Sequence, residues 1–193
     1  MSVLGNGLSD AEYDTDAMSV KEATLAMLRR AGAAEDAILA TQSNLSNTYA
    51  KMERVDQALQ MDREIYSGRL KLHGKENDKT LRAASNYAST LVHLNRFEEA
   101  KSLLRKTIPV ARRVLGESHE TTFKTGWIYA QSLYNDDSAT LDDLREAVTT
   151  LEEIERIARR VFGGAHPSTT GIETSLRMAR EKLRARETPS TRA

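Results

Sequence analysis

Two short stretches of the chain combine residue types that could do chemistry. "RRVLGESH" occupies residues 112–119 and "RRVFGGAH" occupies residues 159–166, so two arginines, two apolar residues, a glycine and a histidine recur in the same order. Paired guanidinium groups could clamp a phosphate, and a histidine could ligate a metal ion. The same recurrence could instead mark the boundaries of a structural repeat. The rest of the sequence decides between a ligand site and a repeat boundary.

The histidines do not form a metal-binding pattern. They stand at positions 73, 93, 119 and 166, no two of them are spaced i, i+4, and the chain contains no cysteine. Zinc sites in proteins usually combine cysteines with histidines or use two histidines at that spacing. "NDDSATLDD" (135–143) lacks the central glycine and final glutamate of a calcium loop. Neither a Ser-His-Asp set nor a catalytic carboxylate pair stands out, so we expect no metal, no cofactor and no enzymatic activity.

Composition narrows the class of protein. The chain has 193 residues, with 28 Lys+Arg and 28 Asp+Glu, and this balance does not favour nucleic acid or a membrane surface as partner. The first twenty residues carry acids where a signal peptide has a cation and an apolar run, and no stretch is apolar for the roughly 20 residues that span a bilayer. Helix-forming residues dominate. We expect a cytoplasmic, all-α protein that is a monomer or a weak oligomer.

The chain repeats itself at a spacing of 42 residues. "NLSNTYAKMERVDQA" (44–58) aligns with "NYASTLVHLNRFEEA" (86–100), and a third copy carries an insertion within residues 134–143. The apolar positions have helical period in each half, which predicts helix pairs. The first helices are expected at 38–52, 80–94 and 122–135, and the second at 55–72, 97–115 and 143–162.

Glycines and polar residues mark the predicted helix ends. Gly74, Gly116 and Gly163 follow the second helices, where a positive φ is favoured. Polar residues then begin the next helices. The candidates for these N-caps are Asn77 or Asp78, Ser118 or His119, and His166 before Pro167. The opening octapeptides are therefore best explained as repeat boundaries.

Small residues recur where the two helices of a pair must approach closely. They are Ser46, Ala88 and Ala130 in the first helices and Ala58, Ala100 and Ala147 in the second. Stacked pairs of this kind need caps at both ends. We expect a disordered acidic leader (1–17), a half repeat (18–36), repeats at 37–79, 80–121 and 122–168, a solvated cap helix (169–187) and a disordered tail (188–193). Arg177 stands in the cap helix where a small residue would continue the repeat.

The pattern resembles tetratricopeptide repeats of the 42-residue type found in kinesin light chains. The resemblance is carried by "NRFEEAKSLLRKTIPVARRVLGESHETT" (95–122) and "VFGGAHPSTT" (161–170). It implies an all-α superhelical solenoid of three helix-turn-helix repeats with capping helices at both ends. It also implies a non-catalytic scaffold or adaptor, in which the first helices of the repeats line a groove for an extended peptide of a protein partner.

By register, the resemblance assigns a set of groove residues. They are Asn44, Asn47, Lys51, Arg82, Asn86, Ser89, His93, Lys124, Trp127 and Gln131, with Ser43, Ser85, Ile128 and Asn135 on the same stripes. Three permanent cations, several amides and no acid suit a peptide that carries carboxylates. Trp127, the single tryptophan, fits either the core or a ligand-stacking role, and truncating it would separate the two.

Two further hypotheses remain open. Cations recur near the ends of the second helices and could form an edge that tracks the phosphates of RNA or another polyanion. They are Arg69, Lys71, Arg112, Arg113, Arg159 and Arg160. In addition, the acidic segment "LSDAEYDTD" (8–16) could occupy the basic groove and regulate it.

Overall fold

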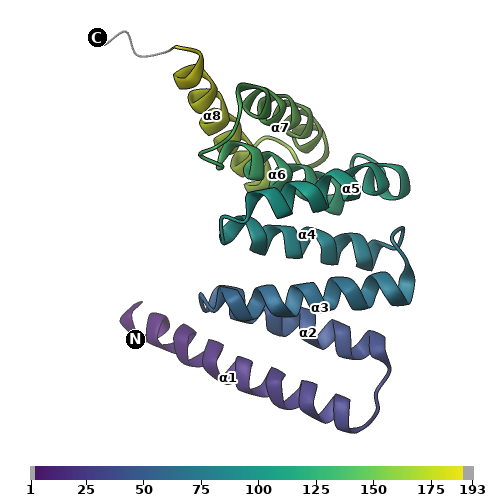
Figure 1. The fold of residues 1–193 in the computed structure, drawn as a ribbon. Helices are drawn as coiled ribbons and strands as arrows, with labels where there is room; N and C mark the ends of the chain where they lie inside the picture. The colour runs from purple at the N-terminus through teal and green to yellow at the C-terminus, as the bar shows by residue number, and fades with distance from the viewer. Residues whose placement is uncertain (1–2, 189–193) are drawn as a thin grey trace. The chain divides into compact units, whose positions relative to one another are not determined.

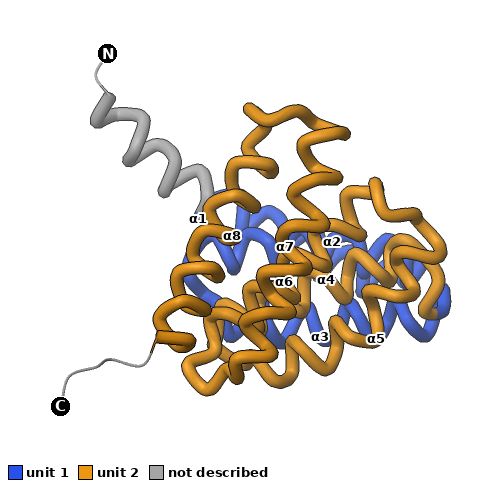
Figure 2. The backbone as a smooth tube through the Cα atoms, turned by 90° about the horizontal axis from the view of Figure 1, so that it is seen from above, with its two compact units in different colours: residues 1–74 blue, residues 75–193 orange. Residues whose placement is uncertain are grey.

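The computed structural model describes the backbone of residues 3–188 and the side chains of residues 15–188. Eight α helices and no strand occupy this described part (Figure 1). They are α1 (Val3–Arg30), α2 (Glu35–Lys51), α3 (Val55–His73), α4 (Asp78–His93), α5 (Phe97–Leu115), α6 (Glu120–Tyr134), α7 (Leu141–Phe162) and α8 (Pro167–Glu187). None of these helices is both long enough and apolar enough to cross a membrane. The chain divides into two compact units, Met1–Gly74 and Lys75–Ala193 (Figure 2).

In the first unit, α2 packs against both α1 and α3. Ser46 of α2 and Ala58 of α3 are both buried, and the Ser46 hydroxyl donates to the Ala58 carbonyl oxygen at 3.2 Å. The predicted small residues therefore allow the two helix backbones to approach. On the other side of α2, Leu25 of α1 joins the core, and the Tyr49 hydroxyl donates to Glu22 at 2.7 Å.

In the second unit, each of the helices α4 to α8 packs on the next, and α6 also contacts α4 and α8. Its core is continuous through these helices. The small residues Ala88, Ala130 and Ala147 are fully buried beside Leu104, Leu133 and Leu151. Burial of this apolar surface is the main stabilising contribution, about 25 cal/mol per Å² removed from water.

The helices end at the glycines that the sequence predicts. Gly74, Gly116 and Gly163 have φ values of 75°, 87° and 85°, and each follows the last residue of a helix. The backbone of any residue other than glycine would be strained at these φ values. The chain then enters the next helix through an N-cap, and the structure selects His119 rather than Ser118 and Asn77 rather than Asp78.

The recurring histidines serve as helix caps. His119 Nδ1 accepts a hydrogen bond from the backbone N–H of Thr121 at 3.2 Å, and His166 Nδ1 accepts one from Ser168 at 3.1 Å. Each ring therefore satisfies a backbone donor that the helix itself leaves without a partner. The two octapeptides end one helix and begin the next, and this accounts for their shared order of residues.

The ends of the chain differ in part from the expected segments. Helix α1 includes residues 3–17, for which we expected a disordered leader, and it continues through most of the expected half repeat to Arg30. The side chains of residues 8–14 lie outside the described residues, as do residues 189–193 of the expected tail. At the third repeat, α7 begins at Leu141, two residues before the expected start, because Thr140 and Asp143 form a capping box.

Two carboxylates, of Asp136 and Asp143, fix the conformation of the segment inserted between α6 and α7. The buried Lys101 ammonium of α5 lies 3.0 Å from Asp136, which also accepts hydrogen bonds from Ser138. These Ser138 bonds, and then the Lys101 bond, lower the pKa of Asp136 from its ordinary value of 3.8. Hydrogen bonds from Thr140 lower the pKa of Asp143 in the same way.

Acid is therefore expected to destabilise the second unit. Because the folded state depresses both pKa values below 3.8, it gains stability from these ionised groups above that pH and loses it as pH falls further. Asp136→Asn and Asp143→Asn should lower the urea midpoint at neutral pH and flatten its dependence on pH below about 4. Urea titrations across this range measure both effects. The exposed Asp137 is the control, and an equal flattening in Asp137→Asn would contradict the assignment.

Candidate functional site

The predicted groove residues of the second unit form one polar surface. Arg82, Asn86, Ser89 and His93 are spaced four, three and four residues apart on α4, so they share one side of the helix. Arg82, Ser89 and His93 are exposed, and Asn86 is half-buried. Helix α6 lies beside α4, and its Lys124 donates from Nζ to Asn86 Oδ1 at 3.2 Å. We call Arg82, Asn86, Ser89, His93, Lys124 and Gln131 the α4–α6 face.

The remaining polar groove residues lie in the first unit. Asn44, Asn47 and Lys51 are exposed on α2. Their spacing of three and four places them on one side of that helix. The same combination of amide and cation therefore occurs in both units, on the first helix of a predicted pair.

Several residues on the predicted stripes are partly or fully buried. Ser85 is fully buried on α4, and Ile128 is 4% exposed within the core of the second unit. Ser43 is half-buried, and its hydroxyl donates to the Leu39 carbonyl. Asn135 is half-buried as the residue that follows α6. Neighbouring helices cover part of each stripe, so the surface that a ligand can reach is narrower than the helical spacing indicates.

Trp127 is explained by packing between α6 and α8. Its half-buried ring lies against the core, and its Nε1–H donates to the Ser175 hydroxyl at 2.8 Å. A Cβ atom added at Gly171 would lie 2.6 Å from Trp127 Cη2, so α8 needs glycine at this contact. The indole N–H is occupied within the protein, and only the exposed part of the ring remains for a ligand.

Helix α8 contributes one exposed position, Met178, that the predicted groove set does not include. The 47-residue spacing between His119 and His166 places Ser175 at the position of Ile128 and Met178 at that of Gln131. Met178 is 42% exposed. The same spacing is the signal in the sequence that finds this position, which a purely solvated cap helix does not predict.

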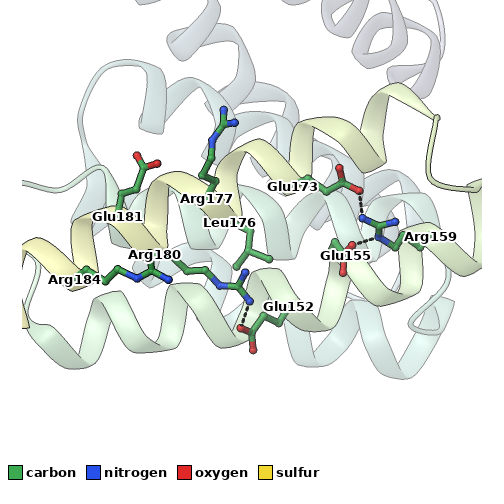
Figure 3. A pocket seen from close by; sticks show the side chains of 9 residues that line it. All are labelled: Glu152, Glu155, Arg159, Glu173, Leu176, Arg177, Arg180, Glu181 and Arg184. Atoms are coloured by element: carbon green, nitrogen blue, oxygen red, sulfur yellow. Dashed lines mark hydrogen bonds and ion pairs between the residues drawn. The ribbon is translucent and has the colours of Figure 1, made fainter.

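A pocket of about 480 Å³ lies between α7 and α8 (Figure 3). Arginines and glutamates alternate around it and largely neutralise one another. Arg180 bonds Glu152 at 2.7 Å, and Arg159 lies 2.6 Å from Glu173 and also bonds Glu155. Arg177 projects away from these pairs (Figure 3). The pocket is a solvated, charge-balanced surface.

The basic edge that would favour a polyanion is also largely neutralised. Arg69 is buried and bonded to Asp36. In the second unit, Arg112 lies 3.1 Å from Glu153 and Arg113 lies 2.7 Å from Glu76. A phosphate would have to displace these carboxylates, so the edge attracts polyanions less than its count of cations suggests.

Comparisons with known proteins identify the repeat and the fold. The family model for the tetratricopeptide repeat matches residues 37–113. Two solved structures come from a candidate kinesin light chain of P. anserina with nearly identical repeats of this kind. One of them, a form with a single substitution, has a TM-score of 0.76 at 19% identity and covers 95% of this chain and 85% of its own. The other form has a TM-score of 0.70 at 19% identity and covers 98% and 94%.

A third solved structure agrees with these two. BtubC (BKLC) of P. vanneervenii has a TM-score of 0.69 at 15% identity and covers 96% of this chain and 80% of its own. No curated protein sequence matches the chain significantly. The predicted fold class, an all-α tetratricopeptide-repeat superhelix, is therefore confirmed.

Proposed function

Because the chain carries tetratricopeptide repeats and has the fold of kinesin-light-chain-like repeat proteins, we propose that it binds an extended, acidic peptide segment of a protein partner. Repeats of this family generally mediate protein–protein interaction, and proteins built from them are typically non-catalytic scaffolds. We extend this to the present chain as a non-catalytic scaffold or adaptor. The binding surface would be the α4–α6 face, with Asn44, Asn47 and Lys51 of α2 binding in the same way and the exposed part of Trp127 beside it.

The observation that carries the proposal is the composition of the α4–α6 face. Arg82 and Lys124 are permanent cations, and no acid is among the residues that define the face. Charge-assisted hydrogen bonds from such groups bind carboxylates strongly. The backbone N–H and C=O groups of an extended peptide have no partners within the peptide. The side-chain amides of Asn86 and Gln131 can donate hydrogen bonds to these groups and accept hydrogen bonds from them. The face thus suits a peptide whose acidic side chains alternate with accessible backbone.

The arrangement of Lys124 is consistent with this role. Its ammonium has three donors, and the bond to Asn86 Oδ1 uses one of them. That bond also fixes the Asn86 amide so that its nitrogen can donate to a ligand. The pair is therefore preorganised, which lowers the entropy lost on binding.

A peptide array tests the proposal with two triple variants. Lys51, Arg82 and Lys124 are replaced by alanine in one, and the exposed Lys106, Arg156 and Arg160 of α5 and α7 in the other, so both lose the same charge. We expect acidic peptides to bind the first variant at least about tenfold more weakly, because hydrogen bonds to charged groups are lost, and to bind the control as they bind the wild type. Added salt should weaken binding to the wild type.

Two outcomes would contradict the proposal. Acidic peptides retained equally by both variants would exclude the α4–α6 face and the α2 residues as the binding surface. Salt-sensitive recovery of RNA alone, with no peptide bound, would instead favour the polyanion-binding alternative.

A further inference from the structure

Helix α1 exposes a side that the corresponding helices bury. At the 42-residue spacing α1 corresponds to α3 and α5, each the second helix of a pair, and Gly32 (φ 62°) corresponds to Gly74. Four equivalent positions are buried in both of these helices, and we call them the pairing side of a second helix. They are Ala58, Asp62, Ile65 and Arg69 in α3, and Ala100, Leu104, Thr107 and Ala111 in α5. At the same positions of α1, all four residues are exposed, namely Asp16, Val20, Ala23 and Met27.

The pairing side of a second helix contacts the first helix of its pair. In α3, the Ala58 carbonyl and the Asp62 carboxylate accept hydrogen bonds from the Ser46 hydroxyl of α2, at 3.2 and 2.6 Å. On α1 the same side carries apolar side chains, since Val20 is 65% exposed and Met27 is 58% exposed. A first helix packed there would remove this apolar surface from water.

Helix α8 has the reverse arrangement. At the 47-residue spacing it corresponds to α6, the first helix of its pair, which packs on α7. Four positions of α6 on the side of this contact are buried, and we call them the pairing side of a first helix. They are Phe123, Gly126, Ala130 and Leu133 in α6, and their counterparts in α8 are Thr170, Glu173, Arg177 and Arg180. The counterparts are exposed apart from the half-buried Glu173. Among the described helices, therefore, none covers the pairing side of α8 or that of α1.

The two uncovered sides carry opposite charges where complete pairs have small residues. That position holds Ser46 on α2 and Ala58 on α3, and the two are in contact. The same position holds Asp16 on α1 and Arg177 on α8. Arg177 is exposed and projects away from the paired side chains of the pocket between α7 and α8 (Figure 3). Its guanidinium is therefore accessible to a carboxylate, with which it can form charge-assisted hydrogen bonds.

The charges around these two residues continue the contrast. Residues 8–16 contain four acids and no base in sequence. From Arg177 to Glu187, α8 carries five Lys or Arg and two Glu. Two helices joined by a short loop are antiparallel, so in a pair of this kind the first half of α1 would lie beside the last half of α8. The attraction between these halves is expected to weaken as salt is added.

We propose that α8 of one copy of the chain binds α1 of a second copy, so that the two pairing sides complete a helix pair between molecules. Asp16 of one copy then forms an ion pair with Arg177 of the other. Val20 and Met27 pack on Leu176 and on the aliphatic stems of the arginines that line the pocket. Because the two surfaces differ, each copy keeps one of them accessible after binding, and assemblies larger than a dimer form. The proposal does not depend on peptide binding, since the pairing sides share no residue with the α4–α6 face.

Sedimentation velocity of the full chain at several protein concentrations tests the proposal. One helix pair buries a small area, so wild type should self-associate with a Kd on the order of 100 µM. Asp16→Lys and Arg177→Glu each place like charges opposite one another and should weaken association at least about tenfold. Both residues are exposed, so neither change should alter the melting temperature at low protein concentration.

Two combinations restore opposite charges and should restore association. In the double variant Asp16→Lys/Arg177→Glu, the reversed ion pair forms between identical copies. An equimolar mixture of the two single variants should likewise associate as wild type does, although neither single variant does so alone. A contact between two copies of α1, or between two copies of α8, would respond to only one of the single reversals, and that result would overturn the proposal.

The controls reverse exposed charges away from both pairing sides. Asp56→Lys on α3 and Lys106→Glu on α5 make the same changes of charge and should leave association unchanged. Wild type that stays monomeric up to about 1 mM would exclude the contact. The contact is also excluded if the single reversals associate as wild type does, or if neither the double variant nor the mixture recovers association.

Discussion

Replacing Ala130 by arginine is expected to unfold the second unit at room temperature. Ala130 is fully buried on α6, and Ala147 of α7 is fully buried in the same core. An arginine at this contact would force the two helices apart or bury a cation without a partner, and either costs more than about 4 kcal/mol. That approaches the whole stability of a small domain. The far-ultraviolet circular dichroism of Ala130→Arg should lose most of the helical signal that this unit contributes.

Arg177 provides a matched control for this experiment. It stands on α8 at the repeat position of Ala130, and its side chain is exposed. Arginine is tolerated there because its side chain is exposed rather than buried against a neighbouring helix. Arg177→Ala should therefore change the free energy of unfolding by less than about 0.5 kcal/mol. A well-folded Ala130→Arg, with a urea midpoint near that of wild type, would show that the repeat contact is not tight.

The repeat positions explain why so much of the fold could be predicted. Helix ends depend on local chemistry, so Gly116 and His119 marked the boundary between α5 and α6 without knowledge of any distant contact. The small residues at Ala88 and Ala130 likewise indicated which sides of the helices approach one another. Three copies of each signal reinforced the interpretation, and the boundaries of α2 to α8 differ from the expected ones by no more than three residues.

The surface was predicted less well, because exposure depends on several helices at once. Spacing on one helix placed Ser85 and Ile128 on the polar stripes, but neighbouring helices bury both.

Truncating Trp127 to alanine is expected to destabilise the second unit by about 3 kcal/mol. The ring is half-buried against the core, and its N–H bonds the buried Ser175, so the change removes apolar contacts and leaves a hydroxyl without a partner. Trp127→Phe keeps most of the packing and should lose only about 1 kcal/mol. Urea denaturation followed by circular dichroism measures both losses. If Trp127→Ala kept wild-type stability but lost peptide binding, the ligand-stacking role would be correct instead.

Gly171 allows the contact itself to be measured. An added methyl would lie 2.6 Å from Trp127 Cη2, and the ring cannot turn aside without losing its bond to Ser175. Gly171→Ala should therefore destabilise wild type by about 1–2 kcal/mol, as overpacking does. In the Trp127→Ala background the clash is absent, and alanine should stabilise α8 by about 0.5–1 kcal/mol, since it loses less backbone entropy than glycine. The double-mutant cycle should thus give a coupling energy of about 2 kcal/mol, and additive effects would mean that the indole does not pack on α8.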